Sequence, residues 1–409
     1  MTSVTVTGMG LVSPVGTVVD EVFTSVCTGR SGLSRPPPAH PLHGVVEVAA
    51  FGPTIDPASV LPATEARTVD RSIVMALRAA RDALADAGIE VGRDVDPHRV
   101  AVVVSGVGGL ATLAEQAARR VDRGRLGVSP YLLSAVLPNM AAARIAIEFG
   151  IRGYVSSVGT ACASGAQSIG EAMRVLRAGE ADVVVCGSSE APLFPTFADA
   201  FGNARAVARD WPDPTAASRP FDRRRNGLVL GEGAGAFVVE RNGFARARGA
   251  RRYAEVLGWA ATNDAYHTAT PRPDGSSAAQ SMRLALRDAG LSTSDIGYLN
   301  AHGTSTKAGD AAEAVAIRSL YGAGSPPVSS TKGVTGHLLG ASGMIEAAIS
   351  IMVLRKGLLP PTHNLDDPDP ACDLDHVRAV RAVPTVGVRA VMSNSFGFGG
   401  HNVSLVFGS

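Results

Sequence analysis

An internal repeat constrains the fold of this chain more than any other feature of its sequence. Three segments of the first part resemble three segments of the second part, and they follow one another in the same order. The pairs are residues 80–88 with 284–290, 163–179 with 341–357, and 231–240 with 397–407. One such match could arise by chance, but three matches in one order indicate a duplication. We therefore predict two similar halves, residues 1–250 and 251–409.

Each half alternates apolar strands with amphipathic helices. The segments 99–105 (RVAVVVS) and 181–186 (ADVVVC) are almost entirely apolar, which is typical of strands that are buried on both faces of a sheet. The sequence has 409 residues, of which 45% are hydrophobic, so a large core can form. These patterns predict an α/β protein in which helices cover a mixed or parallel sheet.

Composition excludes several classes of protein. A formal net charge of +1 provides no overall field for binding nucleic acid or a membrane surface. The sequence contains no apolar run long enough to cross a bilayer, and no signal peptide is visible at its start. The four cysteines are far apart and form no CxxC pair, so neither a disulfide framework nor a zinc site is expected. We expect a soluble, cytoplasmic protein that holds no metal.

The segment 156–170 (SSVGTACASGAQSIG) places a single thiol among residues with very small side chains. Small neighbours would leave room for another molecule to reach the sulfur of Cys162. The residues after it have helical periodicity and end at a glycine, so Cys162 is expected at or just before a helix N-terminus. Unpaired backbone N–H groups and the helix dipole favour a thiolate at that place. A buried structural cysteine is the alternative interpretation.

Two histidines lie in loops that suit the same kind of chemistry. His302 follows an apolar strand in the segment NAHGTST, and the ends of strands are where α/β proteins place reactive groups. His337 lies in a glycine-rich loop that enters a helix, and aligning the repeats places Cys162 opposite Gly340, three residues after His337. A lone histidine is more often structural. Two of them together with a thiol predict a catalytic cleft between the halves.

Four motifs in this order resemble the condensing enzymes of the thiolase superfamily. They are similar to the signatures of β-ketoacyl-acyl-carrier-protein synthases, specifically the KAS II and type II polyketide ketosynthase kind. The motifs are residues 160–165 (TACASG), 300–306 (NAHGTST), 331–340 (TKGVTGHLLG) and 394–400 (NSFGFGG). The resemblance runs from residue 4 to residue 407, essentially the whole chain. It implies a thiolase-like α/β fold of two duplicated, βαβ-rich halves in five layers, usually in a dimer.

The resemblance also implies the roles of the central residues. Cys162 would attack an acyl thioester and hold the growing chain. The backbone N–H groups of Cys162 and Phe396 would form an oxyanion hole, in which the loss of one donor typically costs about 10²–10³-fold in rate. His302 and His337 would hold the carbonyl of a malonyl thioester as CO₂ leaves, and the enolate would attack the acylated sulfur. No cofactor is implied, because the substrates are carried on the phosphopantetheine of an acyl carrier protein.

Further positions match the family in supporting roles. Lys332 and Glu313 resemble an ion pair that supports the histidines. Thr304 and Thr306 would contact the pantetheine arm of the carrier, or would merely cap their loop.

Aromatic and apolar side chains are expected to shape the acyl pocket. Phe396 and Phe201 match positions where rings gate the pocket, although Phe201 could equally belong to the core. Phe398 is expected to contact the substrate. Val107 matches a pocket-lining position, where a small side chain would leave space for a longer chain.

Two kinds of protein partner are expected, an acyl carrier protein and a second subunit. Arg67, Arg71 and Arg205 match positions at which relatives meet an acidic carrier protein, and scattered surface arginine is the alternative for each. We expect a homodimer, or a heterodimer with a related ketosynthase-like subunit. Neither nucleic acid nor a membrane is an expected partner.

Several residues depart from the pattern of the family. Asn226 and Leu228 stand where aspartate and phenylalanine are usual, Lys307 stands where proline is usual, and Tyr154 replaces a proline near the dimer seam. Because the catalytic set is intact, these changes favour polyketide or specialised fatty acyl biosynthesis. The alternatives are a housekeeping fatty-acid elongation synthase and one subunit of a ketosynthase/chain-length-factor heterodimer.

Three related activities fit the sequence less well. A thiolase would use coenzyme A and a second cysteine, and the loop 394–400 contains none. An initiating synthase would have an asparagine in place of His302 or His337. A non-catalytic partner subunit would lack Cys162.

Overall fold

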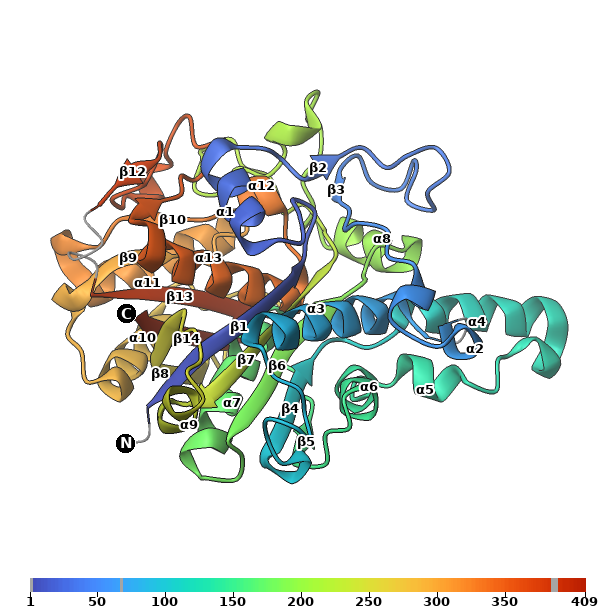
Figure 1. The fold of residues 1–409 in the computed structure, drawn as a ribbon. Helices are drawn as coiled ribbons and strands as arrows, with labels where there is room; N and C mark the ends of the chain where they lie inside the picture. Colours follow the sequence, from blue (N-terminus) through green and yellow to red (C-terminus); the bar gives the residue numbers. More distant parts are fainter. Residues whose placement is uncertain (1–2, 67–68, 384–388) are drawn as a thin grey trace.

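The computed structural model describes residues 3–66, 69–383 and 389–409, and their main feature is one ten-stranded mixed sheet (Figure 1). The strands lie in the order β10-β9-β13-β14-β8-β1-β7-β6-β4-β5. The first part of the chain contributes β1 (Val4–Val12), β4 (Val100–Ser105), β5 (Val155–Ser156), β6 (Val183–Glu190) and β7 (Gly233–Arg241). The second part contributes β8 (Ala254–Asn263), β9 (Ile296–Asn300), β10 (Val328–Ser329), β13 (Ala390–Gly397) and β14 (His401–Gly408).

The sheet repeats one topology twice, outward from its middle. In the first part, β1 is antiparallel to β7, β7 is antiparallel to β6, and β6, β4 and β5 are parallel. In the second part, β8, β14, β13, β9 and β10 follow the same sequence of directions. A short antiparallel pairing of β1 with β8 joins the two parts. The duplicated α/β fold that we predicted from the repeats is confirmed.

Thirteen α-helices are assigned in the described residues. Those of the first part are α1 (Val19–Thr28), α2 (Ala63–Ala66), α3 (Arg71–Ala87), α4 (Leu110–Arg123), α5 (Leu132–Val136), α6 (Met140–Glu148), α7 (Ser164–Arg177), α8 (Pro195–Asn203) and α9 (Asn242–Ala247). Those of the second part are α10 (Ser276–Ala289), α11 (Lys307–Tyr321), α12 (Lys332–Thr335) and α13 (Ser342–Lys356). Two small antiparallel sheets pair β2 (Leu33–Ser34) with β3 (Ala49–Ala50), and β11 (Leu358–Leu359) with β12 (Arg381–Ala382).

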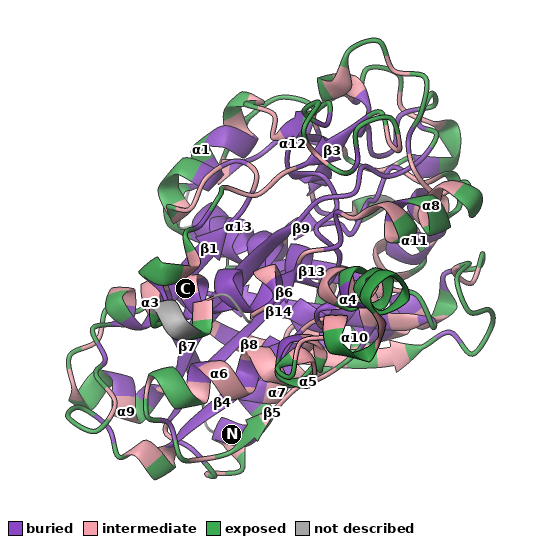
Figure 2. Cartoon of the chain, turned by 90° about the vertical axis from the view of Figure 1, so that its right-hand side faces the viewer, coloured by how far each residue is buried: buried purple, intermediate pink, exposed green. Residues whose placement is uncertain are grey.

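Helices α7 and α13 form the centre of the molecule. They pack on each other and contact strands of both parts of the sheet, whereas α3 covers β1, β7 and β6, and α10 covers β8 and β14. Every residue of α13 from Ser342 to Leu354 is buried, as expected for a helix enclosed on all sides. Figure 2 shows the buried strands and α13 at the centre and a largely exposed α4. In the part of the chain that the structure describes, no helix has the length and apolar character needed to span a membrane.

Candidate active site

Cys162 lies where we predicted it, at the start of a helix. It is the middle residue of a short 3-10 turn, Ala161–Ala163, that leads directly into α7. The hairpin of β13 and β14 approaches this turn so closely that a Cβ on Gly397 would lie 2.5 Å from the Thr160 carbonyl oxygen. Glycine is therefore required there. Cys162 is partly exposed and lines a cavity of about 110 Å³.

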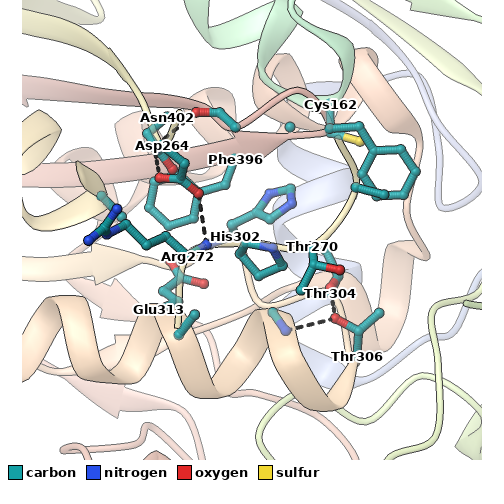
Figure 3. A pocket seen from close by; sticks show the side chains of 18 of the residues that line it. Cys162, Asp264, Thr270, Arg272, His302, Thr304, Thr306, Glu313, Phe396 and Asn402 are labelled. Atoms are coloured by element: carbon teal, nitrogen blue, oxygen red, sulfur yellow. Dashed lines mark hydrogen bonds between the residues drawn. The ribbon is translucent and has the colours of Figure 1, made fainter. Parts of the chain in front are cut away.

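His302 and His337 lie together in the same cavity as Cys162. His302 follows β9, and His337 follows α12. Their ring centroids are 5.3 Å apart and their planes meet at 83°, so the edge of one ring faces the other. Figure 3 shows Cys162, His302 and Phe396 around this space. The structure thus brings together the thiol and both predicted histidines.

Both imidazoles are held in the neutral form. Burial lowers the pKa of His302 and of His337 well below 6.5, and the charge of Lys332 lowers both further. The hydroxyl oxygen of Ser342 accepts the N–H of Leu338 at 2.8 Å and lies 3.1 Å from His337 Nδ1. A hydroxyl that accepts one bond can donate its own proton to Nδ1, which leaves the imidazole proton on Nε2.

Lys332 and Glu313 both hold the His302 loop, but they do not form the predicted ion pair. The buried Lys332 ammonium donates to the His302 carbonyl oxygen at 2.6 Å and pairs with Glu346. Glu313 instead accepts the N–H groups of His302 and Gly303, at 2.9 and 2.7 Å. The predicted Lys332–Glu313 pair is wrong because α13, and not α11, presents its carboxylate to the ammonium.

Glu346 is a site residue that the sequence analysis missed. It is a single carboxylate inside a helix whose other residues up to Leu354 carry no charge. Burial raises its pKa to about 7, and the charge of Lys332 and its hydrogen bond act in the opposite direction. Such a lone acidic residue in an apolar helix is a signal that could have identified it, because a buried charge needs a partner.

Phe398, and not Phe396, supplies the second backbone donor at the sulfur. The backbone N–H groups of Phe398 and of Cys162 itself act on the Cys162 thiol and lower its pKa. Phe396 lies in β13 opposite Asn402, and its ring is 5.8 Å from the His302 ring. These contacts favour Phe398 over Phe396 as the partner of Cys162 in an oxyanion hole.

The thiol is not readily ionised, contrary to our expectation for a helix start. Burial raises the pKa of the Cys162 thiol to about 12, and Glu190 raises it further, while Lys332 and the two N–H groups oppose this. Glu190 is the last residue of β6, and burial raises its own pKa to about 8. The cost of burying a thiolate exceeds the help from the helix N-terminus. A resting thiol therefore has to give its proton to a neighbouring base before it attacks.

The two threonines line the cavity, and one of them also caps a helix. The hydroxyl oxygens of Thr304 and Thr306 are 3.0 Å apart. Thr306 additionally accepts the N–H of Gly309 at 3.2 Å as the N-cap of α11. Ser305 between them has a φ of 71°, a left-handed conformation that turns both hydroxyls toward the cavity, as Figure 3 shows. These contacts are compatible with both interpretations of Thr306, contact with a pantetheine arm and capping of its loop.

The remaining aromatic and apolar predictions have mixed outcomes. The ring of Phe201 stacks on Phe398, with centroids 5.9 Å apart and 16° between the planes, and both rings line the cavity. Phe396 lines the same cavity, as predicted. Val107 is not among the residues that line this cavity, and its N–H donates to Glu190 at 3.3 Å.

Of the three arginines proposed for carrier docking, only Arg205 is an exposed residue in the described structure. Arg67 lies outside the described residues. Arg71 pairs with Glu232 at 2.7 Å and also donates to the carbonyl oxygens of Gly52 and Pro53. Its guanidinium is therefore used within the chain.

A loop that the sequence analysis did not single out covers the cavity. It joins β8 to α10 and includes Asp264, Thr270 and Arg272 among the cavity-lining residues. The Asp264 carboxylate accepts the Asn402 side-chain amide at 2.7 Å and the Arg272 N–H at 2.9 Å, as Figure 3 shows. No repeat or compact motif marks this loop, so it could not be identified from the sequence.

Models of one family match almost the whole chain. Residues 1–245 match the beta-ketoacyl synthase N-terminal domain, and residues 253–366 match the beta-ketoacyl synthase C-terminal domain. A Synechocystis protein named 3-oxoacyl-[acyl-carrier-protein] synthase 2 is 40% identical over 99% of this chain and 97% of its own length. A Vibrio cholerae protein of the same name is 40% identical over 99% of this chain and 98% of its own length.

Solved structures that share this fold over the whole chain include three that are 30%, 32% and 34% identical to it. A beta-ketoacyl synthase from Burkholderia phymatum has a TM-score of 0.93, is 34% identical, and is covered over 99% of its length by the whole of this chain. A ketosynthase bound to a hexaketide, in complex with a type II polyketide acyl-carrier protein, has a TM-score of 0.91 at 30% identity. The ishigamide ketosynthase/chain length factor has a TM-score of 0.91 at 32% identity. The whole of this chain covers 99% of each of these two structures as well.

Proposed function

Because this chain belongs to the β-ketoacyl synthase family and is a 3-oxoacyl-acyl-carrier-protein synthase, a condensing transferase, we propose that it extends acyl chains in polyketide or specialised fatty acyl biosynthesis. The observation that carries the proposal is the single cavity shared by Cys162, His302 and His337. The departures at Asn226, Leu228 and Lys307 favour a specialised substrate or partner. We place the enzyme in the cytoplasm.

In the first half-reaction, Cys162 takes an acyl chain from the carrier. The thiol gives its proton to one of the neutral imidazoles, and the sulfur attacks the thioester carbonyl carbon. The oxyanion that forms accepts the N–H groups of Cys162 and Phe398, and such donors stabilise developing charge. The carrier sulfur then leaves with the proton that the imidazole had taken. The acyl group remains on Cys162 as a thioester.

In the second half-reaction, His302 and His337 act on a malonyl thioester. Their neutral N–H groups donate to its thioester carbonyl oxygen. The bond to the carboxylate breaks, CO₂ leaves, and the electron pair forms an enolate that these donors stabilise. The enolate carbon attacks the Cys162 thioester, a carbon–carbon bond forms, and the Cys162 sulfur leaves as a thiolate that takes a proton from water. The product is a 3-oxoacyl chain, two carbons longer, on the carrier.

Lys332, Glu313 and the two threonines support this chemistry in the proposal. Lys332 and Glu313 fix the backbone of His302 from its carbonyl and its amide side. Thr304 and Thr306 offer adjacent hydroxyls to the amide groups of a pantetheine arm. The exposed Arg205 remains a proposed contact for an acidic carrier protein.

We also propose that a second copy of this chain covers the β5 end of the sheet. Strand β5 ends the ten-stranded sheet, and α4 and α5 project from the body of the molecule beside it (Figure 1). This region exposes many large apolar side chains, including Val121 at 84% and Leu126 at 88%. An open sheet edge beside exposed apolar residues is typical of a subunit interface. Sedimentation of the pure chain distinguishes a homodimer from a monomer that pairs only with a related subunit.

Incubation with a panel of acyl-carriers and malonyl-carrier, with products read by mass spectrometry, tests the proposed function. We expect acylation of the Cys162 peptide, and then a 3-oxoacyl-carrier extended by two carbons. Extension of chains that already carry keto groups or double bonds supports a polyketide or specialised role. Extension of fully reduced chains only would favour the housekeeping alternative. Absence of acylation with every carrier contradicts the proposal.

A further inference from the structure

Four phenylalanine rings form a continuous row that begins at the cavity of Cys162. Phe398 stacks on Phe201 at 5.9 Å, Phe201 contacts Phe197 at 5.2 Å, and Phe197 contacts Phe194 at 5.6 Å between centroids. Three of these rings come from α8 and the residue before it. Their spacing of three and four residues places them on one face of the helix. The helix therefore presents a line of rings that leads away from the sulfur.

The row lies on the apolar side of the thiol. Cys162, Phe197 and Phe201 pack against a small apolar cluster that is separate from the large cores of the sheet. The cluster also contains Leu228 and Leu339. The histidines and threonines of the cavity supply the polar groups, so the sulfur stands at the boundary between polar and apolar surroundings. An acyl chain attached to the sulfur meets ring faces when it turns away from the histidines.

The four rings are not enclosed in the way that core rings are. Phe194, Phe197 and Phe201 are half-buried, and Phe398 is 44% exposed. By contrast, Phe23, Phe221, Phe237 and Phe407 of the main cores are each at most 2% exposed. A row of rings that served only to fill the core would be buried to the same degree. Phe201 and Phe398 line the cavity of Cys162, and the exposed surface of Phe197 and Phe194 continues the row beyond the lining residues, where a longer ligand can contact it.

We propose that Phe398, Phe201, Phe197 and Phe194 form an acyl-chain subsite that selects planar, conjugated chains over saturated chains of equal length. This inference rests on the proposed function, because the chain reaches the row through its thioester with Cys162. Ring faces stack in offset geometry on other flat π systems, beyond the gain from apolar burial alone. A conjugated chain also has few rotatable bonds to immobilise along a rigid surface, whereas a saturated chain loses more entropy there.

The test compares acyl transfer to Cys162 from carrier protein loaded with an eight-carbon saturated chain or an eight-carbon conjugated trienoyl chain. Intact mass of the full-length enzyme gives kcat/KM for each transfer. We expect the wild type to favour the trienoyl chain by about 3- to 10-fold, the range that stacking on one or two rings supplies. Phe197→Leu removes the ring from the middle of the row and is expected to bring the ratio close to one. Phe197→Tyr retains a ring face and is expected to retain the preference.

Phe244→Leu is the matched control. Phe244 is a half-buried phenylalanine on α9 that packs against a different apolar cluster, so its replacement should leave the ratio unchanged. A wild-type ratio near one overturns the inference, and so does a ratio that Phe197→Leu leaves at the wild-type value. Failure of both thioesters to acylate Cys162 contradicts the proposed function instead, so the two failures are distinguishable. The ratio of kcat/KM for the two chains in the wild type tests the proposed selectivity even if Phe197→Leu does not fold.

Discussion

The turn before α7 and the turn before α13 share one backbone design and carry different chemical groups. Each is a 3-10 turn whose first residue has a left-handed φ, 49° at Ala161 and 50° at Leu339. In each turn a serine hydroxyl, that of Ser164 or Ser342, accepts the N–H of the residue four positions earlier, at 2.9 and 2.8 Å respectively. The duplication is therefore retained in the backbone, including a strained conformation that a non-glycine residue rarely adopts.

The middle residue of the turn is where the two copies differ. It is Cys162 in the first turn and Gly340 in the second. A Cβ on Gly340 would lie 2.7 Å from Glu190 Oε1 and 2.9 Å from Ser188 Oγ, so the second turn has no room for a side chain. Its reactive group, His337, comes three residues earlier. One copy can thus present a nucleophile because the other copy packs beneath it and supplies an imidazole.

Removing the thiol makes the first turn resemble the second, and this change should have the largest effect. Cys162→Ala is expected to abolish acyl loading and to lower condensation by about 10⁴-fold or more, as for the loss of other catalytic nucleophiles. Intact mass after incubation with acyl-carrier measures the loading. Cys27→Ala, which removes another partly exposed thiol, should load normally. Normal acylation of the Cys162→Ala variant at some other residue would refute the assignment.

Removing an imidazole should separate the two half-reactions. His302→Ala is expected to load an acyl chain on Cys162 but to decarboxylate malonyl-carrier about 10²- to 10⁴-fold more slowly, because one neutral donor to the enolate oxygen is lost. Release of CO₂ measures the second step and intact mass measures the first. His98→Ala, at an exposed histidine, should change neither rate. Wild-type CO₂ release by the His302→Ala variant would contradict the proposed role.

Glu190 links the two turns, and its titration should appear in the stability of the protein. Its Oε1 would lie 2.7 Å from a Cβ on Gly340 of the second turn, and its charge raises the pKa of the Cys162 thiol of the first. Burial raises the pKa of Glu190 from 4.5 to about 8, so the folded state retains a proton that the unfolded chain loses. Its stabilising contribution is full below pH 4.5 and is lost as the pH rises through about 8.

We therefore expect the free energy of unfolding to fall between about pH 5 and 8 in the wild type relative to Glu190→Gln, by at most about 1.4 kcal/mol per pH unit. Urea unfolding of both proteins across this range measures the difference. Above pH 8 the two curves should run parallel. Parallel curves over the whole range would show that Glu190 ionises in the folded protein as it does in water.

The sequence was sufficient to predict the duplication and the alignment of Cys162 with Gly340, because these depend on local repeats. It was not sufficient to choose between Phe396 and Phe398 as the N–H donor. These residues are two apart in one glycine-rich hairpin, and only the packing of that hairpin on the Cys162 turn decides which amide faces the sulfur. The raised pKa of the thiol could not be predicted either, since the burial that causes it comes from residues far from Cys162 in the sequence, such as Leu42 and Leu339.

The steric difference between the turns predicts a smaller, purely structural effect. Gly340→Ala forces a methyl group against Glu190 and Ser188 and is expected to lower the free energy of unfolding by about 1–3 kcal/mol. Thermal or urea unfolding measures the change. Gly243→Ala is the control, because its new methyl group meets no atom within 4 Å and alanine favours the helix α9. Equal stability of the two variants would mean that the second turn can accommodate a side chain.

Substitution of the two serines tests the comparison of the two turns with the smallest expected effects. Ser164→Ala and Ser342→Ala each remove the hydroxyl that accepts a backbone N–H, and each is expected to cost about 0.5–2 kcal/mol of stability. Only Ser342 also contacts His337 Nδ1, so only Ser342→Ala should slow decarboxylation of malonyl-carrier, by a few-fold, through loss of the correct tautomer. Urea unfolding and CO₂ release measure the two effects separately. An equal loss of decarboxylation in both variants would show that the hydroxyls act only through the turns, and that the two copies differ solely in the thiol.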